Sequence, residues 1–594
     1  MDLLAVEELR TVIDVPGGTV RAVDGVTFRL AAGETLGLVG ESGSGKTMTG
    51  MSIVRLLPPG GRIAAGAIWF GDKDLVSLDE RQMRALRGSE IGVVFQDPMT
   101  SLNPNMPIGE QIAEGVRFHR KVSKQAAMAR AVEALGLVGV PRPLERVKDY
   151  PHQLSGGLRQ RVMIAIALAG EPKLLIADEP TTALDVTIQA QILDLLQDLT
   201  SRLAMALILI THDMGVIAGR TDRVMVMYAG RLVEVAATEQ LFEETRHPYT
   251  EALLASIPKL EGPRDRRLHS IRGLPPDLAN PPPGCRFAPR CSFGDDRCRT
   301  EEPVLGGSDP SHPFACFHPR GLDDAPPSRA SGEASGESAT VGADASTAAA
   351  ELISGNAAAV PAAPGEGASG EVILDLQEVS KEFPVTSGGL LRRTIGALQA
   401  VSGVSLQLVK GETFGLVGES GCGKTTLGRM AVALERPTAG RVVFEGMDLA
   451  TLAGPGLRRA RRHFQLMFQD PYASLDPRMR VGQIISEPLE IQEIGDRLQR
   501  EARVQELLGE VGLSPEAAMG YPHEFSGGQR QRVGLARALA LNPSLIVADE
   551  PVSALDVSIR SQILNLMKRL QAHHRLTYVV ISHDLSVVRY LADR

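Results

Sequence analysis

The chain has 594 residues, of which 43% are hydrophobic and 23% are charged, the ordinary composition of folded globular domains. Its formal net charge is −8, so no strong overall positive charge is available to attract nucleic acid nonspecifically. No uninterrupted apolar run reaches the ~18 residues of a membrane-spanning helix, and the N-terminus, MDLLAVEELR, does not read as a signal peptide. These features predict a cytoplasmic protein that would need a partner to hold it at a membrane.

An internal repeat dominates the sequence. SGG at 155–157 recurs at 526–528, and ADEP at 177–180 recurs at 548–551, with a constant offset. Both halves alternate short apolar runs with longer helical patterns, which indicates an α/β fold with a largely parallel sheet. On this offset Arg594 aligns with Arg223, so we expect the second half either to be truncated or to be completed differently.

The repeat and the composition together predict four parts. Residues 1–259 and 371–594 are the two similar domains, the second C-terminally short. Residues 260–320 are rich in Pro and carry four of the five cysteines, and the second half has no counterpart to them. Residues 321–370 consist mainly of Ala, Gly, Ser, Pro and Glu, and such a segment buries too little apolar surface to fold, so we expect a disordered linker.

Each half contains a phosphate-binding loop: GESGSGKT at 40–47 and GESGCGKT at 418–425 both match GxxxxGK[ST] after an apolar strand. In such a loop the glycines let successive backbone N–H groups point inward, at the positive end of the following helix. The lysine would reach the β- and γ-phosphates and the threonine would bind Mg²⁺. The predicted phosphate-binding residues are Gly40, Ser42, Gly43, Gly45, Lys46 and Thr47, and Gly418, Ser420, Gly421, Gly423, Lys424, Thr425 and Thr426.

A carboxylate pair follows a buried apolar strand in each half, in LLIADEP (174–180) and LIVADEP (545–551). We predict that Asp178 and Asp549 contribute to a Mg²⁺ site, while Glu179 and Glu550 orient the attacking water as bases. The plainer alternative, a carboxylate that only caps a helix, is disfavoured by the phosphate-binding loops upstream.

A second anion-binding helix start occurs in each half, in LSGGLRQR (154–161) and FSGGQRQR (525–532). Ser and two Gly at a helix start leave backbone N–H groups available, although SGG alone is more often a simple cap. Since each half already cradles its own nucleotide, the second start is a candidate for capping the nucleotide of the other half. The residues concerned are Ser155, Gly156, Gly157, Ser526, Gly527 and Gly528.

Both halves contain the same motifs in the same order: the phosphate-binding loop, the FQDP glutamine, SGG, ADEP, ALD and the THD or SHD histidine. This series resembles the ATP-binding-cassette (ABC) ATPases. The resemblance implies two P-loop ATPase domains, each with a mixed or parallel core sheet and a helical subdomain. It also implies that the two cassettes of this chain pack head to tail as an intramolecular dimer, with each ATP between one P-loop and the opposite SGG signature.

The same resemblance assigns further residues. Gln96 and Gln469 match the glutamines that touch Mg²⁺ or water, and His212 and His583 match the histidines that contact the γ-phosphate. Phe383 matches the aromatic residue that stacks on adenine in the second cassette, where the first has Ile13.

Finer motifs resemble the oligopeptide/dipeptide importer ATPases, with two cassettes fused: FQDPMTSLNP, FQDPYASLDP, HPYTEALLASIP and PPPGCRFAPRC. The resemblance implies ATP hydrolysis coupled to peptide import, two transmembrane permease subunits, an extracytoplasmic substrate-binding protein, no nucleic acid, and a place at the cytoplasmic face of the membrane. Nickel chelates and glutathione-like peptides are alternative cargoes. A soluble twin-cassette translation factor is a distant alternative, because its inter-cassette segment would be a charged helical arm.

Cys285, Cys291, Cys298 and Cys316 cluster in the Pro-rich segment with the spacing C-x5-C-x6-C-x17-C. A reducing compartment disfavours disulfides, and little core is available to bury four separate thiols, which leaves a metal site. Four thiolates suit Zn²⁺ or an iron–sulfur cluster, and the lack of close cysteine pairs favours [4Fe–4S]. The resemblance favours it too, because some peptide-importer ATPases carry such a cluster at matching cysteines.

Overall fold

The protein is represented by a computed structural model that divides, by its internal contacts, into two compact units. The first contains the N-terminal half and the Cys-rich segment, and the second contains most of the C-terminal half. Almost all of the predicted linker lies outside the described residues. No helix among the described residues is long and apolar enough to cross a membrane. The structure describes residues 2–16, 18–182, 184–258, 267–307, 309–321, 370–386, 394–470, 474–553 and 555–594.

The first unit is built around a six-stranded core sheet in the order β10 (Arg231–Ala237), β9 (Arg223–Tyr228), β3 (Thr35–Val39), β8 (Ala206–Thr211), β7 (Leu174–Asp178) and β6 (Ile91–Val94). All neighbouring strands are parallel except β9 and β10. The five residues of β7 are all buried, as expected of parallel strands that are covered on both faces. The predicted mixed α/β fold is therefore confirmed for this half.

A second, antiparallel sheet packs over the first P-loop helix in the order β2 (Gly18–Ala31), β1 (Asp2–Val15), β4 (Gly61–Phe70) and β5 (Lys73–Asp74). The two sheets share one apolar core, to which Leu4, Leu38 and Ile176 contribute. This core holds the P-loop helix between the two sheets.

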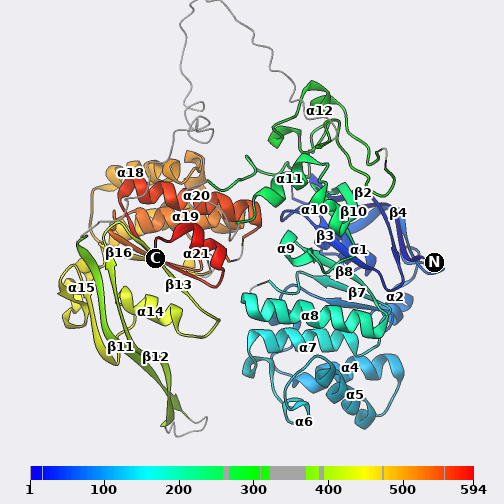
Figure 1. Cartoon of the computed structure of the whole chain (residues 1–594), viewed down its shortest axis with the longest axis horizontal. Helices are drawn as coiled ribbons and strands as arrows, with labels where there is room; N and C mark the ends of the chain where they lie inside the picture. The colour runs from blue at the N-terminus through cyan, green and yellow to red at the C-terminus, as the bar shows by residue number, and fades with distance from the viewer. Residues whose placement is uncertain are drawn as a thin grey trace, which may run out of the picture. The chain divides into compact units, whose positions relative to one another are not determined.

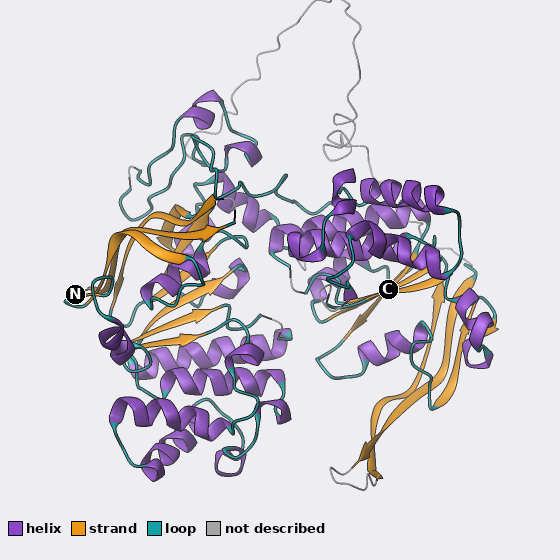
Figure 2. Cartoon of the chain, turned by 180° about the vertical axis from the view of Figure 1, so that it is seen from behind, coloured by secondary structure: helices purple, strands orange, loops and turns teal. Residues whose placement is uncertain are grey.

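Four helices of the first unit, α4, α5, α7 and α8, lie together on one side of the core sheet (Figures 1 and 2). Asp185 caps α8 by accepting a hydrogen bond from the Ile188 N–H at 3.0 Å. The helix bounds are α1 (Lys46–Ile53), α2 (Glu80–Leu86), α3 (Pro98–Ser101), α4 (Ile108–Arg120), α5 (Lys124–Leu137), α6 (Pro143–Arg146), α7 (Gly156–Leu168), α8 (Val186–Leu203), α9 (Met214–Ile217), α10 (Thr238–Glu243), α11 (Pro248–Ala255) and α12 (Asp296–Thr300).

The Cys-rich segment has little regular structure and is tied to the edge of the first unit. The Ala315 N–H donates to the Val233 carbonyl of β10 at 2.8 Å, and the buried His312 side chain lies 2.8 Å from the carboxylate of Glu234. Nearby, Arg320 forms an ion pair with Glu251 of α11 at 2.9 Å. Backbone bonds and buried charges therefore fix this segment, in place of a large apolar core.

The second unit repeats the architecture with a parallel core sheet in the order β13 (Thr413–Val417), β18 (Thr577–Ser582), β17 (Leu545–Asp549) and β16 (Phe464–Met467). Its antiparallel sheet has the order β12 (Thr394–Val409), β11 (Val372–Thr386), β14 (Ala439–Phe444) and β15 (Met447–Asp448). In the first unit, β9 and β10 extend the core sheet beyond β3. Among the described residues of the second unit, no strand extends the sheet beyond β13 in this way. The helices are α14 (Lys424–Ala431), α15 (Gly454–Ala460), α17 (Val481–Ile491), α18 (Arg497–Glu510), α19 (Gly527–Leu539), α20 (Val557–His574) and α21 (Leu585–Leu591).

Candidate active site

Four parallel strands of the first core sheet deliver the predicted site residues at their carboxyl ends. The P-loop follows β3, Gln96 follows β6, Glu179 follows β7 and His212 follows β8. Because parallel strands end at the same edge of a sheet, residues far apart in the sequence meet there. The second unit places its P-loop, Gln469, Glu550 and His583 after β13, β16, β17 and β18 in the same way.

The P-loop backbone has a shape that only glycine accommodates at its last turn. Gly45 has φ 101°, and a Cβ there would lie 2.3 Å from the Ala22 carbonyl oxygen. Gly423 has φ 100°, and its Cβ would lie 2.2 Å from the Ala400 carbonyl oxygen. The helices α1 and α14 begin at the next residue, which turns their first backbone N–H groups toward the loop and makes an anion site.

Both P-loop lysines fold back onto their own loops. The Lys46 ammonium donates to the carbonyls of Gly40 at 2.6 Å and Glu41 at 2.9 Å. Lys424 makes the same two bonds, to Gly418 and Glu419, both at 2.7 Å. Burial lowers the pKa of Lys46 because the charged form is desolvated. A triphosphate in the loop would add negative charge beside the ammonium of Lys46 and so favour its charged form.

The predicted Mg²⁺ ligands meet in each unit. The Thr47 hydroxyl donates to the Asp178 carboxylate at 3.0 Å, and the Thr425 hydroxyl donates to Asp549 at 3.2 Å. Burial raises the pKa of Asp178 to about 6 and also raises the pKa of Asp549. A hydroxyl and a carboxylate are oxygen ligands that suit Mg²⁺, and a bound cation would favour the ionised carboxylate.

The glutamate that follows each aspartate is held by three side chains in the first unit. Glu179 accepts hydrogen bonds from Gln96 at 2.7 Å and Thr182 at 2.9 Å, and its other oxygen lies 3.0 Å from His212 Nδ1. In the second unit the corresponding distances are 2.8 Å from Gln469 to Glu550 and 3.1 Å from Glu550 to His583 Nδ1. The predicted Gln, Glu and His side chains therefore converge on one point in both units.

Electrostatics keep these glutamates ionised. Burial alone would raise the pKa of Glu179, but the hydrogen bond and charge of His212, together with Lys46, bring it down to about 2. The pKa of Glu550 is lowered in the same way, against burial, by His583 and Lys424. Both glutamates have a left-handed backbone, with φ 45° and 47°, at a cost of ~1–3 kcal/mol each. Such strain is commonly kept where a side chain must point at a reacting group.

The SGG motifs lie apart from these clusters, at the starts of α7 and α19. The side chains of Ser155 and Ser526 cap these helices by accepting from the backbone N–H three residues on, and both serines are exposed. Phe383 lies on β11, where the Lys381 ammonium is 5.0 Å from the centre of its ring. The two serines are therefore accessible to a ligand.

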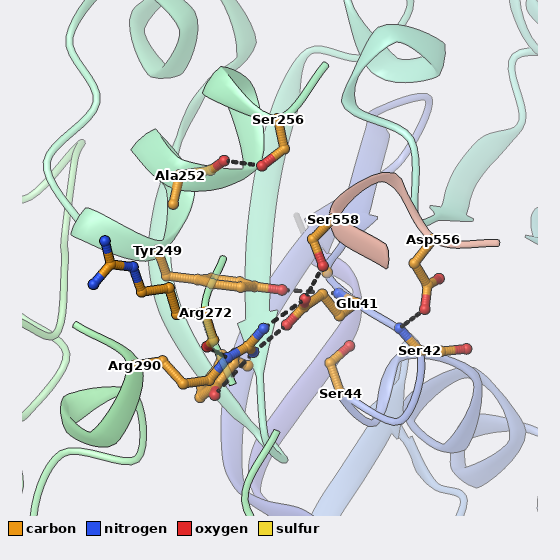
Figure 3. Close-up of polar contacts among 12 residues, drawn as sticks. Glu41, Ser42, Ser44, Tyr249, Ala252, Ser256, Arg272, Arg290, Asp556 and Ser558 are labelled. Carbon is orange, nitrogen blue, oxygen red and sulfur yellow. Dashed lines mark hydrogen bonds and ion pairs between the residues drawn. The ribbon is translucent and has the colours of Figure 1, made fainter. Parts of the chain in front are cut away.

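Three contacts at the first P-loop were not predicted from the sequence. The buried carboxylate of Glu41 pairs with Arg290 of the Cys-rich segment, and the backbone N–H of Glu41 donates to the Tyr249 hydroxyl at 2.8 Å (Figure 3). The third contact is the hydrogen bond from Thr182 to Glu179. Glu41 and Arg290 are 249 positions apart, and no spacing or motif links them. The only available signal was the position of Arg290 directly before a cysteine of the predicted metal site.

The four predicted cysteine ligands are free thiols that lie near one another in the Cys-rich segment. The Phe293 N–H donates to Cys291 Sγ at 3.4 Å, and the His318 N–H donates to Cys316 Sγ at 3.3 Å, each from two residues further on. Burial raises the pKa of Cys316 to about 12, and the three neighbouring cysteines add to the shift. Among the described residues, three ligand atoms within 4.8 Å of one another come from Asp295, Cys298 and His318.

The strand order, the P-loops and the carboxylate clusters define a P-loop ATPase with two nucleotide-binding units. Residues 23–182 and 401–553 match the family model described as ABC transporter, which covers more than half of the chain. The chain belongs to this family and is an ATP-binding-cassette ATPase; ATP and Mg²⁺ are typical of such proteins. Residues 233–298 match a second family model, the oligopeptide/dipeptide transporter C-terminal region.

Two curated relatives match over the whole chain. The oligopeptide transport ATP-binding protein OppD of Mycobacterium tuberculosis is 45% identical over 593 residues, which cover 100% of this chain and 92% of the relative. The glutathione import ATP-binding protein GsiA of Pectobacterium atrosepticum is 44% identical over 598 residues, which cover 100% of this chain and 84% of the relative. The resemblance to a fused, two-cassette importer ATPase is thereby confirmed.

Proposed function

We propose that this chain is the ATP-hydrolysing subunit of an importer that carries peptides across the cytoplasmic membrane. The observation that carries the proposal is the presence, in one chain, of two matches to the ABC transporter family model and one to the oligopeptide/dipeptide transporter C-terminal region. The OppD relative supports peptides as cargo. The GsiA relative supports a second candidate, glutathione, which is itself a small peptide-like molecule.

At each site the chain's own residues bind ATP, hold the metal and position water. Thr47, Asp178 and Gln96 would hold Mg²⁺, which supplies charge neutralisation for the β- and γ-phosphates. Glu179 is ionised and can orient and deprotonate the attacking water, and its oxygens are in contact with Gln96, Thr182 and His212. One of these oxygens contacts His212 alone and so has room to accept a hydrogen bond from water.

The exposed SGG helix starts support a composite site. Each offers free backbone N–H groups at the positive end of a helix, while the P-loop of the same unit has its own helix start for the phosphates. We propose that each ATP is closed between one P-loop and the signature of the other cassette, so that the two cassettes act as an intramolecular dimer. ATP binding would close this dimer and hydrolysis would reopen it.

A cavity of about 240 Å³ in the second unit, lined by both apolar and polar side chains, supports permease partners. It lies between β16, α17 and α19, next to Gln469, and its rim includes Phe468 and Ile491, with exposed fractions of 41% and 52%. An apolar helix of a membrane permease would cover these side chains and sense movement of Gln469. We propose two permease subunits, one for each cassette, an extracytoplasmic substrate-binding protein, and a place for this chain at the cytoplasmic face.

We propose that the four cysteines hold a [4Fe–4S] cluster. Backbone N–H groups directed at Cys291 and Cys316 suit metal-bound thiolates, and a metal would ionise thiols whose burial otherwise keeps them protonated. A tetrahedral zinc site needs sulfur atoms only ~3.8 Å apart, given its Zn–S bond length. Among the described residues the close trio is Asp295, Cys298 and His318, a ligand set that would also suit Zn²⁺, the alternative to the cluster. The cluster would keep the segment ordered.

The glutamate assignment predicts that Glu179→Gln and Glu550→Gln each preserve ATP binding and slow hydrolysis, with the double variant trapped in the closed state. Loss of a base that positions water should cost about 10²–10⁴-fold in turnover. Steady-state ATPase rates of the assembled transporter measure this, and Glu133→Gln, on the exposed side of α5, is the matched control. A double variant as active as the unaltered protein would refute the assignment.

Peptide import predicts that cells lacking this chain lose uptake of labelled di- and oligopeptides. The unaltered chain should restore uptake and the Glu179→Gln/Glu550→Gln variant should not, since transport needs hydrolysis. A panel that also contains glutathione and a nickel chelate distinguishes the cargoes. Loss of glutathione uptake alone would replace the peptide proposal with the second candidate, and unchanged uptake of the entire panel would contradict import by this chain.

The cluster assignment predicts that anaerobically purified protein is brown, absorbs broadly near ~400 nm and contains about four irons per chain. Cys291→Ser should remove the colour and the iron, whereas Cys422→Ser, in the second P-loop, should retain both. Colourless protein with one zinc per chain would refute the iron–sulfur cluster but support a metal site at the four cysteines. Protein without any metal would refute both.

A further inference from the structure

Glu41, the second residue of the first P-loop, is anchored by the Cys-rich segment. Its side chain is only 5% exposed, and both of its carboxylate oxygens accept from the guanidinium group of Arg290, at 2.5 and 3.0 Å (Figure 3). This is the two-pronged geometry in which an arginine and a carboxylate pair most strongly. A buried ion pair therefore joins the phosphate-binding loop to a segment almost 250 residues away.

Arg290 is itself fixed from several sides. Its Nε donates to the Arg272 carbonyl at 2.9 Å, and a terminal nitrogen lies 3.2 Å from the Tyr228 hydroxyl. The Glu41 N–H donates to the hydroxyl of Tyr249, which is fully buried on α11. Tyr249 therefore holds the main chain of Glu41, while Arg290 holds its side chain, to which the Ser558 hydroxyl also donates (Figure 3).

The position of Glu41 matters for nucleotide binding because its carbonyl accepts one of the two hydrogen bonds that place the Lys46 ammonium. A displaced Glu41 would shift this lysine and the adjoining loop amides. The second P-loop offers a comparison within the same chain. Glu419 occupies the corresponding position and its carbonyl holds Lys424, but Glu419 is exposed.

The anchoring arginines adjoin the cysteines. Arg290 directly precedes Cys291, and Arg286 directly follows Cys285. Arg286 is also buried, and it pairs with Asp24 and donates to the carbonyl of Ala229. The order of the cysteine segment and the position of the first P-loop are therefore linked through short stretches of chain.

We propose that Arg290 is a positioning residue for ATP binding at the first site, so that nucleotide affinity there depends on the docked Cys-rich segment while affinity at the second site does not. The proposal deepens the assigned ATPase function and rests on the two ATP sites, but not on the identity of the cargo. Removing Arg290 leaves the buried Glu41 carboxylate without its cation, which is more harmful than removing both charges together.

The test measures the affinity of each site for a fluorescent ATP analogue with Mg²⁺, using the full chain. A Lys424→Ala background isolates the first site and a Lys46→Ala background isolates the second. Arg290→Met should weaken the first site by about tenfold or more, which corresponds to ~1.4 kcal/mol. It should leave the second site within about twofold, which shows that the effect is confined to the first unit. A thermal unfolding profile like that of the unaltered chain shows that the first unit has folded.

Three further variants separate positioning from a general structural effect. Arg290→Lys should recover part of the affinity, and Glu41→Gln/Arg290→Met should bind better than Arg290→Met, because the pair is coupled. Arg299→Met, which removes an exposed arginine of the same segment, is the matched control and should change neither site.

Unchanged first-site affinity in Arg290→Met, or equal weakening at both sites, would overturn the proposal. A double variant no better than Arg290→Met would overturn it as well. If peptides are not taken up but Arg290→Met weakens nucleotide binding at the first site as predicted, peptides are refuted as the cargo and this inference stands.

Discussion

Both ATP sites depend on the arrangement of parallel strands whose carboxyl ends meet at one edge of a sheet. In the first unit, β3, β6, β7 and β8 bring the P-loop, Gln96, Glu179 and His212 together, although these residues span more than 170 positions. A one-residue shift in the register of these strands would turn the carboxylates away from the loop. The buried apolar strands therefore secure the catalytic geometry as well as the fold.

The two halves share this geometry but differ in what surrounds it. The bonds from lysine to loop, threonine to aspartate, and glutamine and histidine to glutamate agree between the units within about 0.2 Å. Among the described residues, Glu41 of the first P-loop is buried and paired with Arg290, whereas Glu419 of the second P-loop is exposed. Equal catalytic clusters within unequal surroundings allow one site to be controlled separately from the other.

The sequence predicted the α/β architecture and the local composition of each site because the motifs are short and contiguous. GxxxxGK[ST] specifies its own turn, and a buried strand ending in Asp-Glu specifies where the carboxylates emerge. It did not predict the Glu41–Arg290 pair, because a buried ion pair between distant residues leaves no periodic pattern. The left-handed backbone of Glu179 and Glu550 was not predicted either, since that conformation is imposed by the surrounding packing and is unusual for glutamate. The roles of the SGG motifs stay predictions.

The central claim is that each P-loop forms a composite ATP site with the SGG signature of the other cassette in the same chain. Cys422 lies in the second P-loop and is exposed, so Ser155→Cys in the first signature gives a pair of thiols for a short bismaleimide cross-linker. In the Glu179→Gln/Glu550→Gln background with ATP and Mg²⁺, the account predicts a cross-link between positions 155 and 422 within one chain, which peptide mass spectrometry would identify. The yield of this cross-link should be lower without nucleotide. Cross-links that form only between two chains, or none that depend on ATP, would contradict it.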